Sequence, residues 1–439
     1  MATAVTREAG HQVYLLDAQA KNLPYQKTME MLEFFQPNIA VIWCTTPTIY
    51  NDIAFTNMVK IKDKDCMTVL VGAHPSSLPE ETLKISDKID AVAVNEFDYT
   101  IRDLANGTPM ENCLGLVYRK GNKISRNKPR PFIEDLNSLP FPAWEFLDVF
   151  DYSDAGKLYP FITQIGSRGC PNVCTFCHNR YTISGGTFRK QSAQRRLDEI
   201  QHDFELFPML KEIMIEDDTL VSKENERDAL DFCWEIINRG MDFTWSANAR
   251  PNITNSLLLR TMKKCGARMF CVGYESGSQE ALNVVNKRIT LDEMRMFSKL
   301  TRMNDIEVNG CFMIGFPNET RESALQTIEF AKELNPNTAQ FSVLVPYPAT
   351  HFYNWAKQNG FIVAKDWTEW VDNNFEQATV ISYPQLSREE MTEFADRGLK
   401  EFYLRKDKII ELLFNIKSMA DIHRFYHGIR SYINYFLKI

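Results

Sequence analysis

The chain has 439 residues, and 50 Lys and Arg against 57 Asp and Glu give it a formal net charge of −7 at pH 7. Hydrophobic residues make up 44% and charged residues 24%, which is typical of a folded globular protein and excludes a disordered chain. The negative charge argues against nucleic acid as a partner. No apolar run reaches the roughly 18 residues of a membrane-spanning helix, and the N-terminus does not resemble a signal peptide. We therefore expect a cytoplasmic protein.

Short apolar runs alternate with helical patterns over the first part of the chain. Strands are predicted at 11–17, 39–44, 67–72 and 89–94, and a helix at 27–35. This alternation is typical of βαβ units around a parallel, doubly wound sheet. We predict one such domain over residues 1–110, with ligand-binding loops at the carboxyl ends of its strands.

The chain then changes character before a second βα series begins. A hairpin with a Gly-Asn turn is predicted at 114–125, and the Pro-rich stretch 139–144 reads as a connector, so that 111–155 forms a hairpin and linker. Six further strands are predicted at 160–166, 211–217, 242–247, 267–273, 307–315 and 339–346. Six units indicate a partial, open barrel over 156–365. A helical, comparatively basic region completes the chain over 366–439.

Three of the ten cysteines form a separate group. Cys170, Cys174 and Cys177 follow the first strand of the second series with the spacing C-x₃-C-x₂-C. A structural zinc site needs four ligands, and a 4Fe–4S cluster normally takes four thiolates. Three thiolates without an evident fourth predict a cluster with one open iron, which could bind a small molecule and pass it an electron. A loop zinc site with a distant fourth ligand is the alternative.

The cysteine triplet resembles the signature of the radical SAM superfamily. In that family the three cysteines ligate a 4Fe–4S cluster, S-adenosylmethionine (SAM) chelates the fourth iron, and one-electron reduction cleaves SAM to a 5′-deoxyadenosyl radical. The resemblance implies that Phe176 lies near the adenine. It implies further cofactor-binding residues at later strand ends, namely Glu216, Asp217, Asp218, Asn248, Arg250, Glu275, Ser276 and Gly315. A helix N-cap role for Asp218 or Thr219 is the alternative.

Residues 71–81 and 94–96 resemble the cobalamin-binding domain that precedes the barrel in one radical SAM class. The resemblance implies a corrin at the carboxyl edge of the first sheet, near Thr45, Thr46, Gly72 and His74. We expect His74 to make loop hydrogen bonds rather than to ligate cobalt. Members of that class usually begin with a further strand before the helix that corresponds to residues 2–10. Cobalamin is therefore expected as a cofactor, with a first domain that lacks its usual first strand.

Within that class, stretches such as 95–101 and 272–277 resemble the HpnJ-like enzymes of hopanoid biosynthesis. This implies carbon–carbon bond formation or ring rearrangement on a lipid-linked or polyol-like substrate, with a reductant such as flavodoxin or ferredoxin. Cobalamin-dependent methyl transfer is the alternative within the family, and a non-catalytic iron–sulfur redox or sensor protein is the alternative outside it. The C-terminal region is expected to form a helical cap over the open barrel, with its basic residues as a solvated face. Peripheral contact of this cap with an anionic membrane is the sharper alternative, suggested by apolar residues beside Arg405, Lys406, Lys408, Lys417, Arg424 and Arg430.

Overall fold

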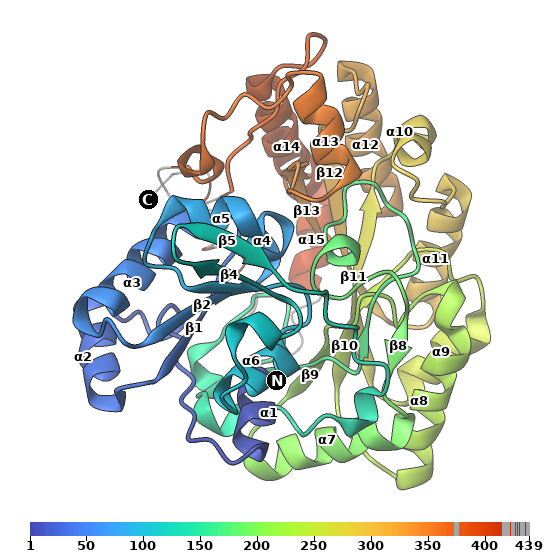
Figure 1. The fold of residues 1–439 in the computed structure, drawn as a ribbon. Coiled ribbons are helices and arrows are strands. Elements are labelled where there is room, and N and C mark those ends of the chain that lie inside the picture. Colours follow the sequence, from blue (N-terminus) through green and yellow to red (C-terminus); the bar gives the residue numbers. More distant parts are fainter. Residues whose placement is uncertain are drawn as a thin grey trace.

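The computed structural model of the chain describes residues 1–372 and 377–414, together with the single positions 422, 426, 428, 430 and 435. Two α/β units lie side by side, the first in blue and teal and the second in green to orange (Figure 1). Each unit is built on its own sheet. In the first sheet β1, β2 and β3 run parallel, and in the second sheet all six strands do. This is the α/β architecture that the sequence predicts.

The first sheet has five strands in the order β1-β2-β3-β4-β5. The strands are β1 (Ile39–Trp43), β2 (Met67–Val71), β3 (Ala91–Ala93), β4 (Leu116–Lys120) and β5 (Lys123–Arg126). The helices are α1 (Ala2–Glu8), α2 (Tyr25–Phe35), α3 (Ile49–Lys62), α4 (Ala73–Ser77), α5 (Pro79–Ile85) and α6 (Asp98–Ala105). Alternate residues of β2 enter two different cores, since Val69 packs with α6 while Leu70 packs with α3 and α5. Both faces of the sheet are therefore covered, as a parallel sheet requires.

Two features of the first unit differ from the sequence-based prediction. The strand expected at 11–17 does not form, because none of its residues is buried and no strand pairs with that side of β1. The hairpin expected at 114–125 does form, but it extends the first sheet instead of standing apart as a linker. It does so because Leu116, Val117 and Tyr118 are buried where β4 pairs antiparallel with β3. The division of the chain into four regions stays a prediction.

The second sheet has six parallel strands in the order β13-β12-β11-β10-β9-β6, and it does not close. The strands are β6 (Phe161–Gln164), β9 (Glu212–Ile215), β10 (Trp245–Ala249), β11 (Ala267–Glu275), β12 (Glu307–Ile314) and β13 (Thr338–Val343). All six strands and the open form agree with the prediction. A separate pair, β7 (Ser167–Arg168) and β8 (Arg189–Lys190), brackets the segment that holds the three cysteines.

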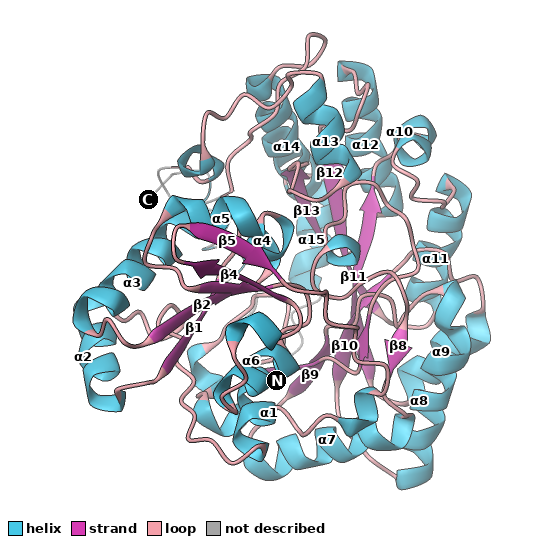
Figure 2. Cartoon of the chain, in the orientation of Figure 1, coloured by secondary structure: helices cyan, strands magenta, loops and turns pink. Residues whose placement is uncertain are grey.

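Helices cover the outer face of this second sheet (Figure 2). They are α7 (Ala193–Leu206), α8 (Glu226–Arg239), α9 (Ser256–Lys264), α10 (Gln279–Val284), α11 (Leu291–Met303) and α12 (Arg321–Leu334). The aromatic side chains of Trp245, Phe270 and Phe312 are fully buried in the core between strands and helices. On β12, buried residues alternate with half-buried ones such as Asn309 and Cys311, so the inner face carries smaller and more polar groups. Ligands of a parallel sheet bind at the carboxyl ends of its strands, so the loops that follow these strands are where we look for the functional site.

The C-terminal part supplies α13 (His351–Gln358), α14 (Arg388–Tyr403) and α15 (Lys406–Phe414). Two of the basic residues that the sequence placed on a membrane-facing surface contact other parts of the protein instead. Lys408 is fully buried and donates to the carbonyl of Pro336, and Arg405 donates to the side chain of Asn335. Lys417 and Arg424 lie outside the described residues, and the predicted membrane contact stays a prediction. None of the helices in the described part of the chain is long and apolar enough to span a bilayer.

A buried group of charges joins the two units. Glu96, which follows β3, forms an ion pair of 2.8 Å with Arg189 on β8. Asp98 at the start of α6 pairs with Arg168 on β7 at 2.8 Å, and Arg168 also lies 3.4 Å from Glu96. All four side chains are at most 15% exposed, so the low surrounding polarity strengthens their attraction. The first unit is thus fixed directly to the strands beside the cysteine loop.

Replacing Glu96 with Ala should destabilise the protein by about 3–5 kcal/mol, because two buried arginines would lose a shared carboxylate. The matched control is Glu80→Ala, which removes an exposed ion pair with Arg126 and should cost less than about 1 kcal/mol. Urea unfolding followed by tryptophan fluorescence measures both. Equal losses for the two variants would show that the buried charges do not hold the units together.

Candidate active site

The three cysteines lie on the loop between β7 and β8, close after the carboxyl end of β6. Cys174 is buried, and Cys170 and Cys177 are half-buried. Burial raises the pKa of the Cys170 thiol and raises that of Cys177 to about 11. The loop turns tightly at Gly169, whose φ of +90° and closeness to the Thr187 carbonyl leave no room for a side chain.

Two adjacent carboxylates after β9 hold this loop. Asp217 is fully buried, and its Oδ1 accepts hydrogen bonds from the backbone of Gly166 (2.8 Å) and Ser167 (3.0 Å). Its Oδ2 lies 2.7 Å from Nη2 of Arg196 on α7. The sequence predicted that Asp217 binds SAM, but here both of its oxygens are engaged within the protein. Its place in the structure is that of a residue that positions the cysteine loop.

Asp218 connects the two ends of the cysteine loop. One carboxylate oxygen accepts from the backbone N–H of Gly169 at 3.1 Å, and the other accepts from Nδ2 of Asn179 at 2.9 Å. Gly169 directly precedes Cys170, and Asn179 follows Cys177 by two residues. Asp218 therefore closes the loop around the three thiols, a role that the sequence pattern did not distinguish from a direct contact with SAM.

The middle of the loop is fixed by backbone contacts to other elements. The N–H of Thr175 donates to the carbonyl of Val285 (3.0 Å), at the end of α10, and the carbonyl of Thr175 accepts from Phe352 on α13 (3.0 Å). Arg180 donates to the carbonyls of Cys170 (3.0 Å) and Asn172 (3.3 Å). These contacts hold the loop in one conformation from three sides.

A zinc ion and an iron–sulfur cluster place different demands on the three thiols. A single zinc ion would require the three sulfurs to meet at one point, whereas in a 4Fe–4S cluster each thiolate binds a different iron. His178 is turned toward another partner, with its ring centroid 5.3 Å from that of Tyr347.

Glu216 and Asn248 meet at the ends of neighbouring strands. Glu216 follows β9 and is exposed, and its Oε2 accepts a hydrogen bond of 2.9 Å from Nδ2 of Asn248 near the end of β10. The structure thus brings together two of the residues that the sequence placed at the barrel mouth. Unlike Asp217, Glu216 has a carboxylate that remains accessible to a ligand.

Arg250 and Glu275 belong to one chain of contacts that starts at the cysteine loop. Nη1 of Arg250 lies 3.8 Å from Sγ of Cys174, and its Nη2 donates to the carbonyl of Lys287 at 2.5 Å. The ammonium of Lys287 pairs with Glu275 at 2.6 Å. Glu275 ends β11 with a φ of +69°, a strained conformation of the kind found at functional sites. Lys287 was missed by the sequence analysis, because a single lysine in a turn carries no recognisable pattern.

Ser276 takes no part in this chain. It is fully buried, and its Oγ lies 3.1 Å from Oγ1 of Thr327 on α12 while accepting from the N–H of Ser278 at 3.0 Å. The sequence predicted Ser276 in the SAM pocket together with Glu275. In the structure Ser276 contacts α12 while Glu275 pairs with Lys287, and the contact of Ser276 with SAM stays a prediction.

Gly315 and Phe176 lie close to one another through Phe316. The ring of Phe176 makes an edge contact of 6.0 Å between centroids with Phe316, and Gly315 directly follows β12 with a φ of +103°. The carboxylate of buried Glu319 accepts from the N–H groups of Gly315 and Phe316, and burial raises its pKa to about 7. Glu319 thereby shapes the loop that the sequence placed against the adenine.

The four residues expected near a corrin all lie at the carboxyl edge of the first sheet, Thr45, Thr46 and Gly72 on loops and His74 on the short helix α4. Oγ1 of Thr46 lies 3.2 Å from Nδ1 of His74, and Oγ1 of Thr45 lies 2.9 Å from that of Thr48. Gly72 approaches the backbone of Cys44 so closely that a Cβ would lie 2.4 Å from its carbonyl oxygen. His74 is buried, which lowers its pKa to about 4.

Several buried polar atoms around these loops have no partner within the described residues. They are Oε1 of Gln164, Oγ of Ser167 and Nε of Arg250 near the cysteine loop, and Nε2 of His74 on the first sheet. Unsatisfied buried polar atoms are costly and call for a ligand or water. The residues present therefore fit a polar cofactor beside the thiols, and they offer one free ring nitrogen at the edge of the first sheet.

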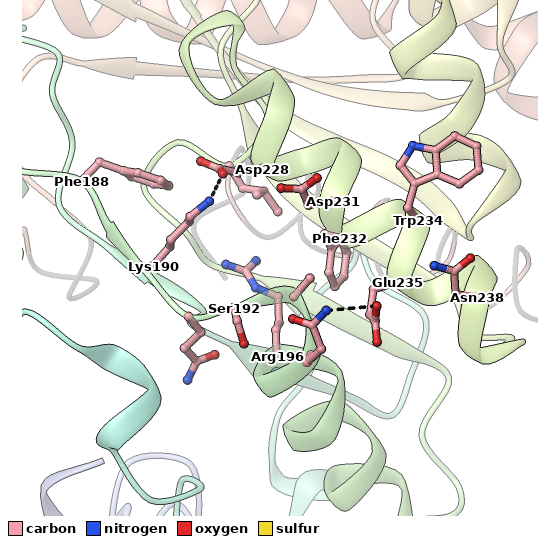
Figure 3. Close-up of a pocket in the computed structure, with 14 residues that line it drawn as sticks. Phe188, Lys190, Ser192, Arg196, Asp228, Asp231, Phe232, Trp234, Glu235 and Asn238 are labelled. Carbon is pink, nitrogen blue, oxygen red and sulfur yellow. Dashed lines mark hydrogen bonds and ion pairs between the residues drawn. The ribbon is translucent and has the colours of Figure 1, made fainter.

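A separate cavity of about 390 Å³ lies on the outer side of the barrel between α7 and α8 (Figure 3). Lys190 pairs there with Asp228, and Arg196, which also lines the cavity, is already bound to Asp217. Lys190 and Asp228 thus neutralise each other, and the charge of Arg196 is compensated by a carboxylate that does not line the cavity. The cavity reaches only the far end of the cysteine loop, at Phe188, and none of the three cysteines lines it, so we assign it no part in the chemistry.

We expect Asp218→Ala to lower the iron bound per chain after cluster reconstitution, because the loop would lose its contacts to Gly169 and Asn179. Glu216→Ala is the matched control, since this neighbouring carboxylate does not contact the loop. Iron and sulfide analysis measures both variants. If Asp218→Ala binds as much iron as the control, Asp218 is not needed to hold the cysteine loop around the cluster.

Glu319 should make stability fall as pH rises. Its folded-state pKa of about 7 exceeds the ordinary 4.5, so its contribution is fully present below pH 4.5 and is lost as pH approaches 7. The loss is on the order of 3 kcal/mol for a buried group. Glu319→Gln should therefore show a flatter decline in thermal stability between pH 5 and pH 8 than the wild type. Glu389→Gln, at an exposed position of α14, should follow the wild type. If the melting temperature of Glu319→Gln changes with pH as that of the wild type does, Glu319 is not protonated in the folded protein below pH 7.

Comparison with known proteins extends these observations. Residues 165–331 match the model of the radical SAM superfamily, and residues 1–105 match that of the B12 binding domain. An uncharacterized methyltransferase of Pyrococcus horikoshii is 29% identical, over 92% of this chain and 87% of that protein. An anaerobic magnesium-protoporphyrin IX monomethyl ester cyclase of Rubrivivax gelatinosus is 26% identical over 78% of this chain, which spans 62% of the cyclase. A hopanoid C-3 methylase of Methylococcus capsulatus is 24% identical over 82% of this chain and 68% of its own length.

Among solved structures, the radical SAM methyltransferase TsrM from Kitasatospora setae, with cobalamin and a 4Fe–4S cluster bound, shares the fold. Its TM-score is 0.71 at 15% sequence identity, over 91% of this chain and 86% of TsrM. The cysteine spacing, the six-stranded open sheet and the preceding α/β unit agree with these matches. The chain therefore combines a radical SAM domain over residues 165–331 with a B12-binding domain over residues 1–105, and it is an enzyme whose cofactors are a 4Fe–4S cluster, S-adenosylmethionine and cobalamin.

Proposed function

We propose that this enzyme is a cobalamin-dependent methyltransferase that uses SAM as its methyl source and radical precursor. The observation that carries the proposal is the meeting of the two sheet edges. Oγ of Ser77, at the end of α4, donates to the carbonyl of Pro348 beyond β13 at 3.3 Å. Asp98, beyond β3, pairs with Arg168 two residues before Cys170. Loops at the carboxyl edges of both sheets are therefore in contact, and parallel sheets bind ligands at these edges.

This contact supports a reaction that needs both cofactors at one site. Bound cobalamin would carry a methyl group. One molecule of SAM would supply that methyl group and leave as S-adenosylhomocysteine, and a second molecule, cleaved with one electron at the cluster, would supply the substrate radical and leave methionine. The three cysteines would hold the cluster. Exposed Glu216 and the Glu275–Lys287 pair offer charged and polar groups for the amino and carboxylate ends of SAM. The loop of Gly315, shaped by Glu319, would support the adenine.

The relatives favour methyl transfer over the bond formation or rearrangement expected from sequence. The relative from Pyrococcus horikoshii is named as a methyltransferase and matches 92% of this chain. The hopanoid C-3 methylase keeps a lipid-type substrate within the proposal, as the sequence suggested. The cyclase from Rubrivivax gelatinosus supports ring formation as the second candidate. Both methyl transfer and ring formation would need a small electron donor, such as flavodoxin or ferredoxin, to reduce the cluster.

The two candidates differ in what becomes of SAM. Reconstituted enzyme loaded with cobalamin and given reductant and SAM should form S-adenosylhomocysteine and methylcobalamin, even before a substrate is known. Cys174→Ala should lose the production of 5′-deoxyadenosine. Liquid chromatography with mass spectrometry measures all three products. If 5′-deoxyadenosine forms while cobalamin stays unmethylated and no S-adenosylhomocysteine appears, methyl transfer is wrong and ring formation takes its place.

A further inference from the structure

The guanidinium of Arg250 is a buried charge that faces a thiol. Arg250 directly follows β10 and is 7% exposed. Nη1 lies 3.8 Å from Sγ of Cys174. None of the carboxylates in the described ranges forms an ion pair with it, although buried cations are ordinarily paired. The Cys174 thiolate, once the cluster is bound, would place a negative charge in direct contact with Arg250.

The other contacts of Arg250 keep it from turning away. Its own N–H donates to the carbonyl of Val221 at 2.8 Å, which fixes the backbone. Its Nη2 donates to the carbonyl of Lys287. Lys287 lies in a tight turn in which Asn286 and Arg288 both have positive φ.

The same turn also holds the cysteine loop. Its first residue, Val285, accepts a hydrogen bond from the N–H of Thr175, the neighbour of Cys174. The turn therefore holds both partners: the carbonyl of Lys287 binds the guanidinium of Arg250, and the carbonyl of Val285 binds the backbone next to Cys174. The distance between the guanidinium and the Cys174 sulfur is set by the backbone and not by a flexible side chain alone.

The three thiols differ in the donors that reach them. Cys170 receives a neutral amide, because Nδ2 of Asn172 lies 3.5 Å from its sulfur. Cys174 receives the charged guanidinium. Hydrogen bonds to cluster sulfurs set the reduction potential, and a positive charge stabilises the more negative, reduced cluster.

We propose that Arg250 is a positioning residue that donates an N–H···S hydrogen bond to the Cys174 thiolate and thereby raises the reduction potential of the cluster. It makes the cluster easier to reduce, which is the step that precedes SAM cleavage. The proposal rests on the cluster and not on methyl transfer, so it can be tested without SAM, cobalamin or substrate.

The experiment is a redox titration of the reconstituted full-length protein, followed by the visible absorbance of the cluster in the absence of SAM. Arg250→Gln should shift the midpoint potential to a more negative value at an iron content equal to the wild type. Arg250→Lys keeps the charge but cannot bridge Cys174 and Lys287 together, so its potential should lie between the two.

Lys287→Gln is the matched control. It removes a positive charge nearby, while the backbone carbonyl that holds Arg250 remains. Its shift should be clearly smaller than that of Arg250→Gln. An unchanged potential in Arg250→Gln, or an equal shift in Lys287→Gln, overturns the proposal. If Arg250→Gln does not retain its cluster, Arg250→Lys decides: a lower potential supports the hydrogen bond, and the wild-type potential contradicts it.

Discussion

The buried carboxylate of Asp217 is the contact on which the site depends. It joins the end of β9, the backbone at Gly166 and Ser167 beyond β6, and Arg196 on α7. A buried charge of this kind is tolerated only when its hydrogen bonds are satisfied, so the three elements must meet in one way. The cysteine loop leaves from this junction, and Asp218 then closes it. The geometry of the thiols is thus set by carboxylates that need not touch a cofactor.

The second constraint is the contact between the two sheets. The buried charges of Glu96 and Asp98 reach Arg168 and Arg189 on the strands that bracket the cysteines. Because both sheets present their carboxyl edges near this contact, the loops predicted to bind the two cofactors lie on neighbouring edges.

The sequence predicted the strands of both sheets because apolar periodicity reports burial directly, as on β2 and β12. It failed at residues 11–17, where the pattern is apolar but no neighbouring strand is present to pair with it. The positions of site residues at strand ends were predictable, since topology alone places them there. The separate roles of these residues were not predictable, because the carboxylates at 216, 217 and 218 look alike in sequence. Only packing separates exposed Glu216 from buried Asp217, and only the turn after α10 brings Lys287 to Glu275.

The central claim is that Cys170, Cys174 and Cys177 hold a 4Fe–4S cluster whose fourth iron is open to SAM. The most direct test is electron paramagnetic resonance of the reduced, reconstituted protein with and without SAM. The account predicts a 4Fe–4S signal that changes in shape when SAM is added, because SAM becomes a ligand of the open iron. A signal that is identical with and without SAM, in protein that contains the full cluster, would contradict it.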